Sequence, residues 1–205
     1  MIFLALACRP DPGSPSYPDP SAVLDSGSDS DDPDNYPGPD PYTAGESRLS
    51  LGAFYEGGYS ELMPVDDVSI FFYVYSSTFS QATESTERIE GYVSDRITVG
   101  GVGWWGGGIQ SNAAIDLSAW DTLHFSAMSE DVVDFDIRMQ SGTEGTVDAS
   151  SYGFTNDGEW HAMEIPLSDL AGVTLSKVTG QFIFIGEGDP EGSVIFFDNL
   201  YYTAD

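Results

Sequence analysis

The sequence is poor in cysteine and in basic residues. It has one cysteine, Cys8, and one lysine, Lys177, among 205 residues. A single cysteine excludes an internal disulfide and any metal site built from several cysteines. The chain carries 34 acidic residues against 6 basic ones, a net charge of −28. This charge argues against binding to nucleic acid or to anionic lipid headgroups.

Patterns that mark common catalytic sites are also absent. The sequence has no Gly-x-Ser-x-Gly elbow, no His-Glu-x-x-His motif and no cysteine after residue 46 that could pair with a histidine. Its 2 histidines, His124 and His161, lie on separate predicted strands, so we expect no zinc site. Carboxylate pairs able to cleave glycosides are unavoidable in so acidic a chain and therefore indicate nothing. We predict that the chain is not an enzyme.

The first residues resemble the end of a bacterial lipoprotein signal. Residues 1–7, MIFLALA, are apolar and lead directly to Cys8. The resemblance implies a lipid on Cys8 and an extracytoplasmic protein, either secreted or held at the outer membrane or cell surface. The stretch is shorter than the roughly 15–30 residues of a working signal, which a start codon upstream of Met1 would explain. The alternative is a chance apolar start that carries a free thiol.

No later segment is long and apolar enough to span a bilayer, so we expect membrane attachment only through Cys8. Residues 9–46 contain nine of the 12 prolines, among Asp, Ser and Gly. Such a segment buries too little apolar area to offset the entropy of ordering, and its carboxylates and prolines keep it extended. We predict a disordered acidic linker between a lipoprotein signal remnant (residues 1–8) and a folded domain (residues 47–205).

The pattern of the folded domain is all-β. Short runs of β-branched and aromatic residues alternate with breaks rich in Gly, Asp, Asn and Ser, as is typical of a sandwich or barrel. No window of about 12 residues has a helical stripe. The predicted strands are 70–75, 91–99, 123–128, 133–139, 160–165, 181–185 and 194–202.

Three segments of this domain resemble jelly-roll, galactose-binding-like carbohydrate-binding modules. In order along the chain they are IDLSAWDTLHFSAM, DGEWHAMEIPLSDL and SVIFFDNLYY. The resemblance covers residues 73–202 and implies a jelly-roll β-sandwich of two antiparallel sheets. It also implies a non-catalytic module that binds a polysaccharide or oligosaccharide on one sheet face. The alternative is a structural or adhesive surface lipoprotein that binds protein partners with the same fold.

The run VGGVGWWGGG places Trp104 and Trp105 among glycines. Glycine neighbours leave room on the ring faces, and sugars stack their C–H faces on such rings, so we predict ligand binding here. Adjacent residues of a strand point to opposite sides. One ring therefore enters the core, and we expect Trp105 to be the outer one. Tyr152, in a Ser/Gly-rich loop, is a further candidate ligand-binding ring.

Polar candidates come from two neighbouring strands. Strands 123–128 and 133–139 follow each other across a short Ser-Glu-Asp turn, and we expect them to pair antiparallel. One face of the pair would then carry His124, Asp136 and Arg138 beside the tryptophans. Carboxylates accept hydrogen bonds from sugar hydroxyls, and Arg and His donate them. The alternative is a solvated sheet face with an Asp136–Arg138 ion pair.

The resemblance further implies a structural Ca²⁺ site. Asp198 matches the aspartate that these modules carry in the last strand, and Glu56 is assigned as a second ligand only from its position near the first strand. Calcium takes six to eight oxygen ligands, and the sequence does not show which others converge. The alternative role of Asp198 is hydrogen bonding within the final turn. The sequence predicts no oligomeric state.

Overall fold

The computed structural model describes residues 48–51, 65, 67–89 and 93–204. In this part the chain forms two antiparallel sheets. A six-stranded sheet has the order β3-β4-β11-β6-β9, with β1 beside β11, and a five-stranded sheet has the order β2-β5-β10-β7-β8. The strands are β1 Arg48–Ser50, β2 Ile70–Val74, β3 Phe79–Glu84, β4 Ser94–Val99, β5 Trp104–Ile115, β6 Thr122–Met128, β7 Asp136–Gln140, β8 Glu144–Asp148, β9 His161–Pro166, β10 Val178–Glu187 and β11 Val194–Thr203.

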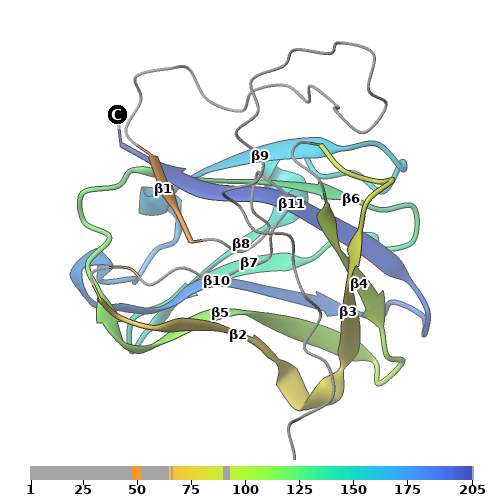
Figure 1. The fold of residues 1–205 in the computed structure, drawn as a ribbon, viewed down its shortest axis with the longest axis horizontal. Coiled ribbons are helices and arrows are strands. Elements are labelled where there is room, and N and C mark those ends of the chain that lie inside the picture. Colours follow the sequence, from red (N-terminus) through yellow and green to blue (C-terminus); the bar gives the residue numbers. More distant parts are fainter. Residues whose placement is uncertain (1–47, 52–64, 66, 90–92, 205) are drawn as a thin grey trace, which may run out of the picture. The chain divides into compact units, whose positions relative to one another are not determined.

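The sheets stack as a sandwich, which confirms the predicted all-β jelly-roll class. Figure 1 shows β6, β9 and β11 in an upper layer, with β2, β5 and β10 in a lower layer. Short 3-10 turns connect the strands at Tyr75–Ser77, Ala149–Tyr152, Leu167–Asp169 and Leu175–Lys177. None of the helical turns in the described ranges is long and apolar enough to cross a membrane.

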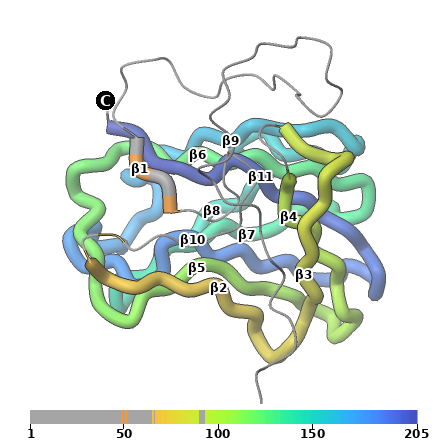
Figure 2. The backbone as a smooth tube through the Cα atoms, in the orientation of Figure 1, coloured from red at the N-terminus to blue at the C-terminus, as the bar shows by residue number. Residues whose placement is uncertain are grey.

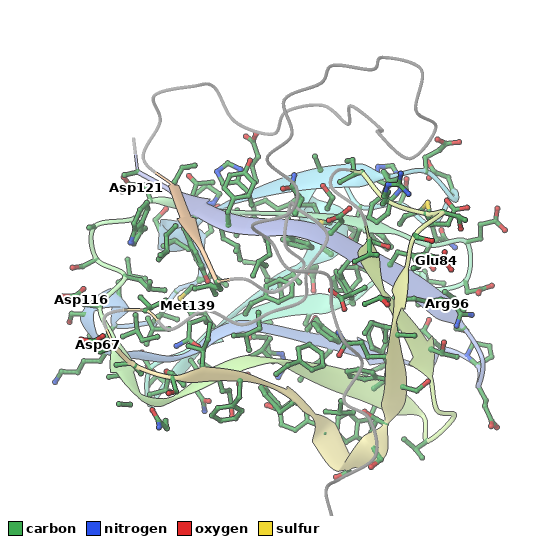
Figure 3. All side chains as sticks on the ribbon, in the orientation of Figure 1. Asp67, Glu84, Arg96, Asp116, Asp121 and Met139 are labelled. Carbon is green, nitrogen blue, oxygen red and sulfur yellow. The ribbon has the colours of Figure 1, made fainter. Side chains whose placement is uncertain are left out.

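Aromatic rings from both sheets fill the core. Phe182 and Phe184 of β10 point inward and meet Phe125 and Phe197 of the other sheet, with centroid distances of 5.1 Å for Phe125–Phe182 and 4.9 Å for Phe184–Phe197. All four rings are almost wholly buried, and edge-to-face or offset pairs such as these stabilise a core beyond the area they bury. Met139, labelled in Figure 3, is also fully buried between the layers.

The predicted pairing of strands 123–128 and 133–139 is wrong. β6 belongs to the six-stranded sheet and β7 to the five-stranded sheet, and Figure 2 shows the chain leaving β6 and turning down to β7. Ser129 begins the crossing, because its hydroxyl accepts hydrogen bonds from the amides of Asp131 and Val132 at 3.0 and 2.9 Å. Val132 then enters the core with no exposed surface. Because this valine is buried in the core, the link crosses from the six-stranded sheet to the five-stranded sheet and does not form a hairpin.

Gly108 is required where β5 approaches β10. A Cβ at this position would lie 2.1 Å from the carbonyl oxygen of Phe182, and backbone atoms cannot move aside as a side chain can. We expect Gly108→Ala to lower the free energy of unfolding by about 3 kcal/mol, at the upper end of overpacking costs. Urea denaturation followed by circular dichroism measures the change.

The matched control for this substitution is Gly142→Ala. Gly142 also has a positive φ, +90°, but an added Cβ would have nothing within 4 Å. We expect a loss of about 1–2 kcal/mol from the left-handed backbone conformation alone. Equal losses in the two variants would show that the close approach at Gly108 has no energetic consequence.

Candidate functional site

The adjacent tryptophans point to opposite sides of the five-stranded sheet, as predicted, but the assignment of the sides was wrong. Trp105 is fully buried, whereas Trp104 is 38% exposed. The indole Nε1–H of Trp105 donates to Oδ2 of Asp189 at 2.7 Å, so the buried ring has the polar partner that it needs. Gly186 makes room for it, because a Cβ there would lie 2.3 Å from the indole. Trp105 is therefore a core residue and cannot touch a ligand.

Trp104 belongs to a row of aromatic residues on the outer face of the five-stranded sheet. Phe72 packs against the core, so the alternate residues of β2 point outward. Phe71 is 43% exposed, and the row continues through Tyr73 to Tyr75, whose ring centroid lies 6.0 Å from that of Trp104. We call this row the aromatic strip; its members are Phe71, Tyr73, Tyr75 and Trp104.

The two tyrosines of the strip fix each other. Their ring centroids are 4.8 Å apart with an interplanar angle of 77°, and the hydroxyl of Tyr73 donates to the hydroxyl of Tyr75 at 3.0 Å. Partial burial and this hydrogen bond raise the pKa of Tyr73 well above its ordinary value. Tyr73 is therefore a neutral hydrogen-bonding hydroxyl at physiological pH, and its hydrogen bond to Tyr75 holds the two rings in one relative orientation.

Charged side chains form the opposite margin of the same face. Arg138 of β7 donates from Nη2 to Asp136 at 2.6 Å and from Nη1 to Glu144 of β8 at 2.9 Å. Burial opposes the charged form of the guanidinium, but these two hydrogen bonds raise the pKa of Arg138 above its usual range. We call Asp136, Arg138 and Glu144 the charged strip. Its carboxylates retain lone pairs that can accept hydrogen bonds from ligand hydroxyls.

Strand register places the two strips on one surface. Tyr73 pairs with Gly108 of β5, Gly108 with Ile183 of β10, and Ile183 with Arg138 of β7. These residues therefore form one row across the sheet, with an aromatic end, a glycine and an aliphatic side chain in the middle, and a charged end. Ile183 has no exposed surface, so the apolar surface that a ligand can reach on this face is that of the aromatic strip. Exposed rings with a few fixed polar groups on the same face are typical of carbohydrate and other small-ligand sites.

His124 lies on the other side of the sandwich, so the predicted row of His124, Asp136 and Arg138 is wrong. Its position follows from the crossing after β6. The imidazole stacks on the ring of Tyr201, with centroids 4.6 Å apart and planes 4° apart, and Nε2 lies 2.8 Å from Oγ1 of Thr203. Asp136 and Arg138 do share a face with Trp104, and the alternative expectation that they form an ion pair is confirmed.

Tyr152 does not join the aromatic strip. It ends the 3-10 turn after β8, and its half-buried ring packs against the core. Its hydroxyl donates to Oδ2 of Asp169 at 2.8 Å. Burial and then this hydrogen bond raise the pKa of Tyr152. These contacts give Tyr152 a structural role in the loop, and its predicted role as a ligand-binding ring stays a prediction.

The described residues do not by themselves build a calcium site. Asp198 is fully buried and its Oδ2 accepts a hydrogen bond from the amide of Ile89 at 2.9 Å. No group of three or more His, Cys, Asp or Glu side chains that could hold a metal occurs within the described ranges. Glu56 and Cys8 lie outside these ranges, so the predicted metal ligand pair and the lipidation site stay predictions.

Phe71, Tyr73 and Tyr75 were missed as site residues at the sequence level. The run IFFYVY predicts a strand, and alternation places these three rings on one of its faces. An aromatic residue at every second position, with no polar residue on the opposite face, was the available signal. The glycines of β5 drew attention to the tryptophans instead.

Comparison with known proteins gives the chain its family. The family model for carbohydrate binding domain 30 matches residues 64–204. Two crystal structures of a family 30 carbohydrate-binding module share the fold at 22% sequence identity. One aligns with a TM-score of 0.55 over 66% of this chain and 92% of the module, and the other with a TM-score of 0.53 over 78% and 85%.

A third structure with this fold is the family 11 carbohydrate-binding module of the cellulosomal cellulase Lic26A-Cel5E of Clostridium thermocellum. It is 16% identical, with a TM-score of 0.52 over 80% of this chain and 97% of the module. No curated protein sequence matches the chain. The match to the family model covers well over half of the sequence. The chain therefore belongs to the carbohydrate binding domain 30 family, and it is a carbohydrate-binding module.

Proposed function

We propose that the outer face of the five-stranded sheet, between the aromatic and charged strips, is the glycan-binding surface of this module. The observation that carries the proposal is the exposure of Trp104 beside Tyr75 on the same face as the Asp136–Arg138–Glu144 cluster. Aromatic rings stack on the C–H faces of sugars, and carboxylates fix the hydroxyls, so the two strips supply both halves of carbohydrate recognition.

The same surface favours single, neutral polysaccharide chains. The rings of Tyr73 and Tyr75 lie at 77° to each other, and those of Tyr75 and Trp104 at 51°, so no two neighbouring rings form one flat platform for a crystalline surface. The charged strip has two carboxylates and one guanidinium, on a chain with a net charge of −28. The negative electrostatic potential of the chain would repel the carboxylates of uronic acid polymers.

Affinity electrophoresis of the full chain tests the proposal. The native gels would contain hydroxyethyl cellulose, mixed-linkage β-glucan, xylan or galactomannan, with polygalacturonate and alginate as acidic polymers. We expect retardation by at least one neutral polysaccharide and by neither acidic one. Folded protein that migrates unretarded in every neutral gel would refute the assigned surface and its ligand class.

We further propose that the module has no catalytic activity of its own and acts by retaining polysaccharide or by holding a partner enzyme near it. Its membership of a carbohydrate-binding family supports this role. The runner-up is an adhesive protein that binds other proteins with the same face. Retardation by polysaccharide together with no release of reducing sugar separates the binding module from both an enzyme and a protein adhesin.

A lipid anchor at Cys8 is part of the proposal. The apolar run MIFLALA before this cysteine and the Pro- and Asp-rich residues 9–46 support a module held away from a bacterial membrane on an extended stalk. In the native host, with the gene expressed from its own chromosomal locus, we expect Cys8→Ser to move the protein from the membrane fraction to the soluble fraction. Incorporation of labelled fatty acid should be lost at the same time.

The control for the anchor is Ser14→Ala, a substitution of one small residue in the linker that leaves the cysteine in place. It should leave both fractionation and labelling unchanged. Wild-type protein that takes up no fatty acid, or a Cys8→Ser variant that stays in the membrane fraction, would contradict the anchor.

The calcium site implied by the family resemblance stays a proposal that involves Asp198 and Glu56. Calcium that binds only the folded state raises the melting temperature by mass action. A melting temperature that is equal in excess calcium and in excess chelator would remove calcium from the account.

A further inference from the structure

The outer face of the six-stranded sheet carries a hollow that is separate from the aromatic strip. Its volume is about 130 Å³, and the residues around it include His124, Ser126, Glu164, Asn199 and Tyr201. These residues come from β6, β9 and β11, which are neighbours in the sheet. A space of this volume holds several water molecules, so it has room for a polar ligand.

A β-bulge turns Asn199 toward this hollow. Along β11 there are three residue steps from Asp198 to Tyr201, whereas the paired stretch of β6, from Ser126 to His124, has two. The extra residue in β11 lies beside Asn199, whose φ is +65°. A left-handed backbone is uncommon for residues other than glycine, and bulges often re-aim a side chain next to a functional site.

The amide of Asn199 is buried with an unused acceptor. The residue is 4% exposed, and its Oδ1 has no hydrogen-bond partner in the described part of the chain. Leaving a buried amide oxygen unpaired is unfavourable, and a ligand hydroxyl in the hollow would supply the missing donor. Ser126 and Glu164 add a hydroxyl and a carboxylate to the same lining, so the hollow is rich in acceptors and suits a ligand that carries several donors.

An aromatic wall completes the site. The rings of His124 and Tyr201 stack with an interplanar angle of 4°, and the contact of His124 with Thr203 fixes the imidazole. Apolar side chains, among them Ala162 and Met163, complete the lining. Apolar surface next to several acceptors matches the C–H faces and hydroxyl groups of a sugar ring.

We infer that this hollow is a second sugar-binding site, on the opposite side of the sandwich from the aromatic strip, and that it takes one pyranose unit. The inference goes beyond the proposed function and does not depend on the aromatic strip.

The test is a titration of the ¹⁵N-labelled full chain with methyl β-D-glucopyranoside, methyl β-D-galactopyranoside and methyl β-D-mannopyranoside, followed by NMR. We expect at least one of the glycosides to shift the side-chain amide resonance of Asn199 and the backbone amide of Ser126 in a saturable way. The same shifts should occur in Trp104→Ala, which alters only the other face.

Two variants locate the binding. Asn199→Gly keeps the left-handed backbone but removes the amide, and we expect the dissociation constant read at Ser126 to rise about tenfold. Ala162→Trp, at an exposed position of β9 that lines the hollow, should fill the space and abolish the shifts. Ala82→Trp, at an exposed position of β3 outside the hollow, is the matched control and should bind as the wild type does.

The inference is overturned if none of the three glycosides shifts Asn199 at saturating concentration, or if the response of Ser126 persists unchanged in both Asn199→Gly and Ala162→Trp. Retardation by polysaccharide is a separate readout that depends on the aromatic strip. If only the NMR shifts are absent, the second site is refuted; if only the retardation is absent, the aromatic strip is refuted as the binding surface.

Discussion

Trp105→Ala is expected to lower the free energy of unfolding by about 3–5 kcal/mol, the range for truncation of a large aromatic residue in a packed core. The substitution removes a fully buried indole that contacts Phe184 at a centroid distance of 5.7 Å. It also deprives the buried carboxylate of Asp189 of its donor at 2.7 Å, which adds the cost of an unpaired polar group. Chemical denaturation measures the loss.

Trp104→Ala is the matched control for this prediction, because it removes the same side chain from the neighbouring position. Trp104 is 38% exposed, so we expect its removal to lower the free energy of unfolding by about 1 kcal/mol or less. Similar losses in the two variants would mean that both rings contribute equally to the core, and the description of the site would then be wrong.

Trp104→Ala should have little effect on stability but a large effect on carbohydrate binding. We expect Trp104→Ala to raise the dissociation constant for the retarding polysaccharide about five- to tenfold, because it removes the most exposed indole face of the aromatic strip, and stacking on a ring is worth about 1–1.5 kcal/mol. Tyr75→Ala should have a comparable effect, since it also leaves Tyr73 without its hydroxyl partner. Isothermal titration calorimetry with the soluble polysaccharide gives both values.

The control for binding is Val133→Ala. Val133 is 69% exposed and lies in the link before β7, outside the aromatic strip. The dissociation constant of Val133→Ala for the polysaccharide should equal that of the wild type. If Trp104→Ala and Val133→Ala bind alike, the aromatic strip takes no part in carbohydrate recognition.

Much of the architecture could be predicted from the sequence, because period-two alternation identifies strands without knowledge of their partners. Which strands pair with each other could not be predicted as reliably. Consecutive strands are usually neighbours, and this made a hairpin of 123–128 and 133–139 the natural expectation. What decides the outcome is the burial of Val132 in the link, and the sequence does not show where a single valine in a turn will pack.

The side of the sheet on which each tryptophan lies was predicted wrongly for a different reason. Gly106, Gly107 and Gly108 follow Trp105 directly, and glycines carry no side chain that marks the inward face of a strand. Ile109 is the first informative residue beyond them. It is fully buried, and alternation counted back from it places Trp105 inside. Asp136 and Arg138 of the charged strip were easier to predict, because they lie two residues apart on a strand with apolar neighbours, whereas Glu144 of β8 was missed.

The most direct test of the account is the behaviour of the two adjacent indole N–H resonances during titration of the ¹⁵N-labelled module with cellohexaose, xylohexaose and mannohexaose. We predict that the Nε1–H signal of Trp104 shifts with at least one of these chains, while the signal of Trp105, hydrogen-bonded to Asp189, stays in place. A titration that moves Trp105 and leaves Trp104 unchanged would contradict the assignment of the aromatic strip as the binding surface.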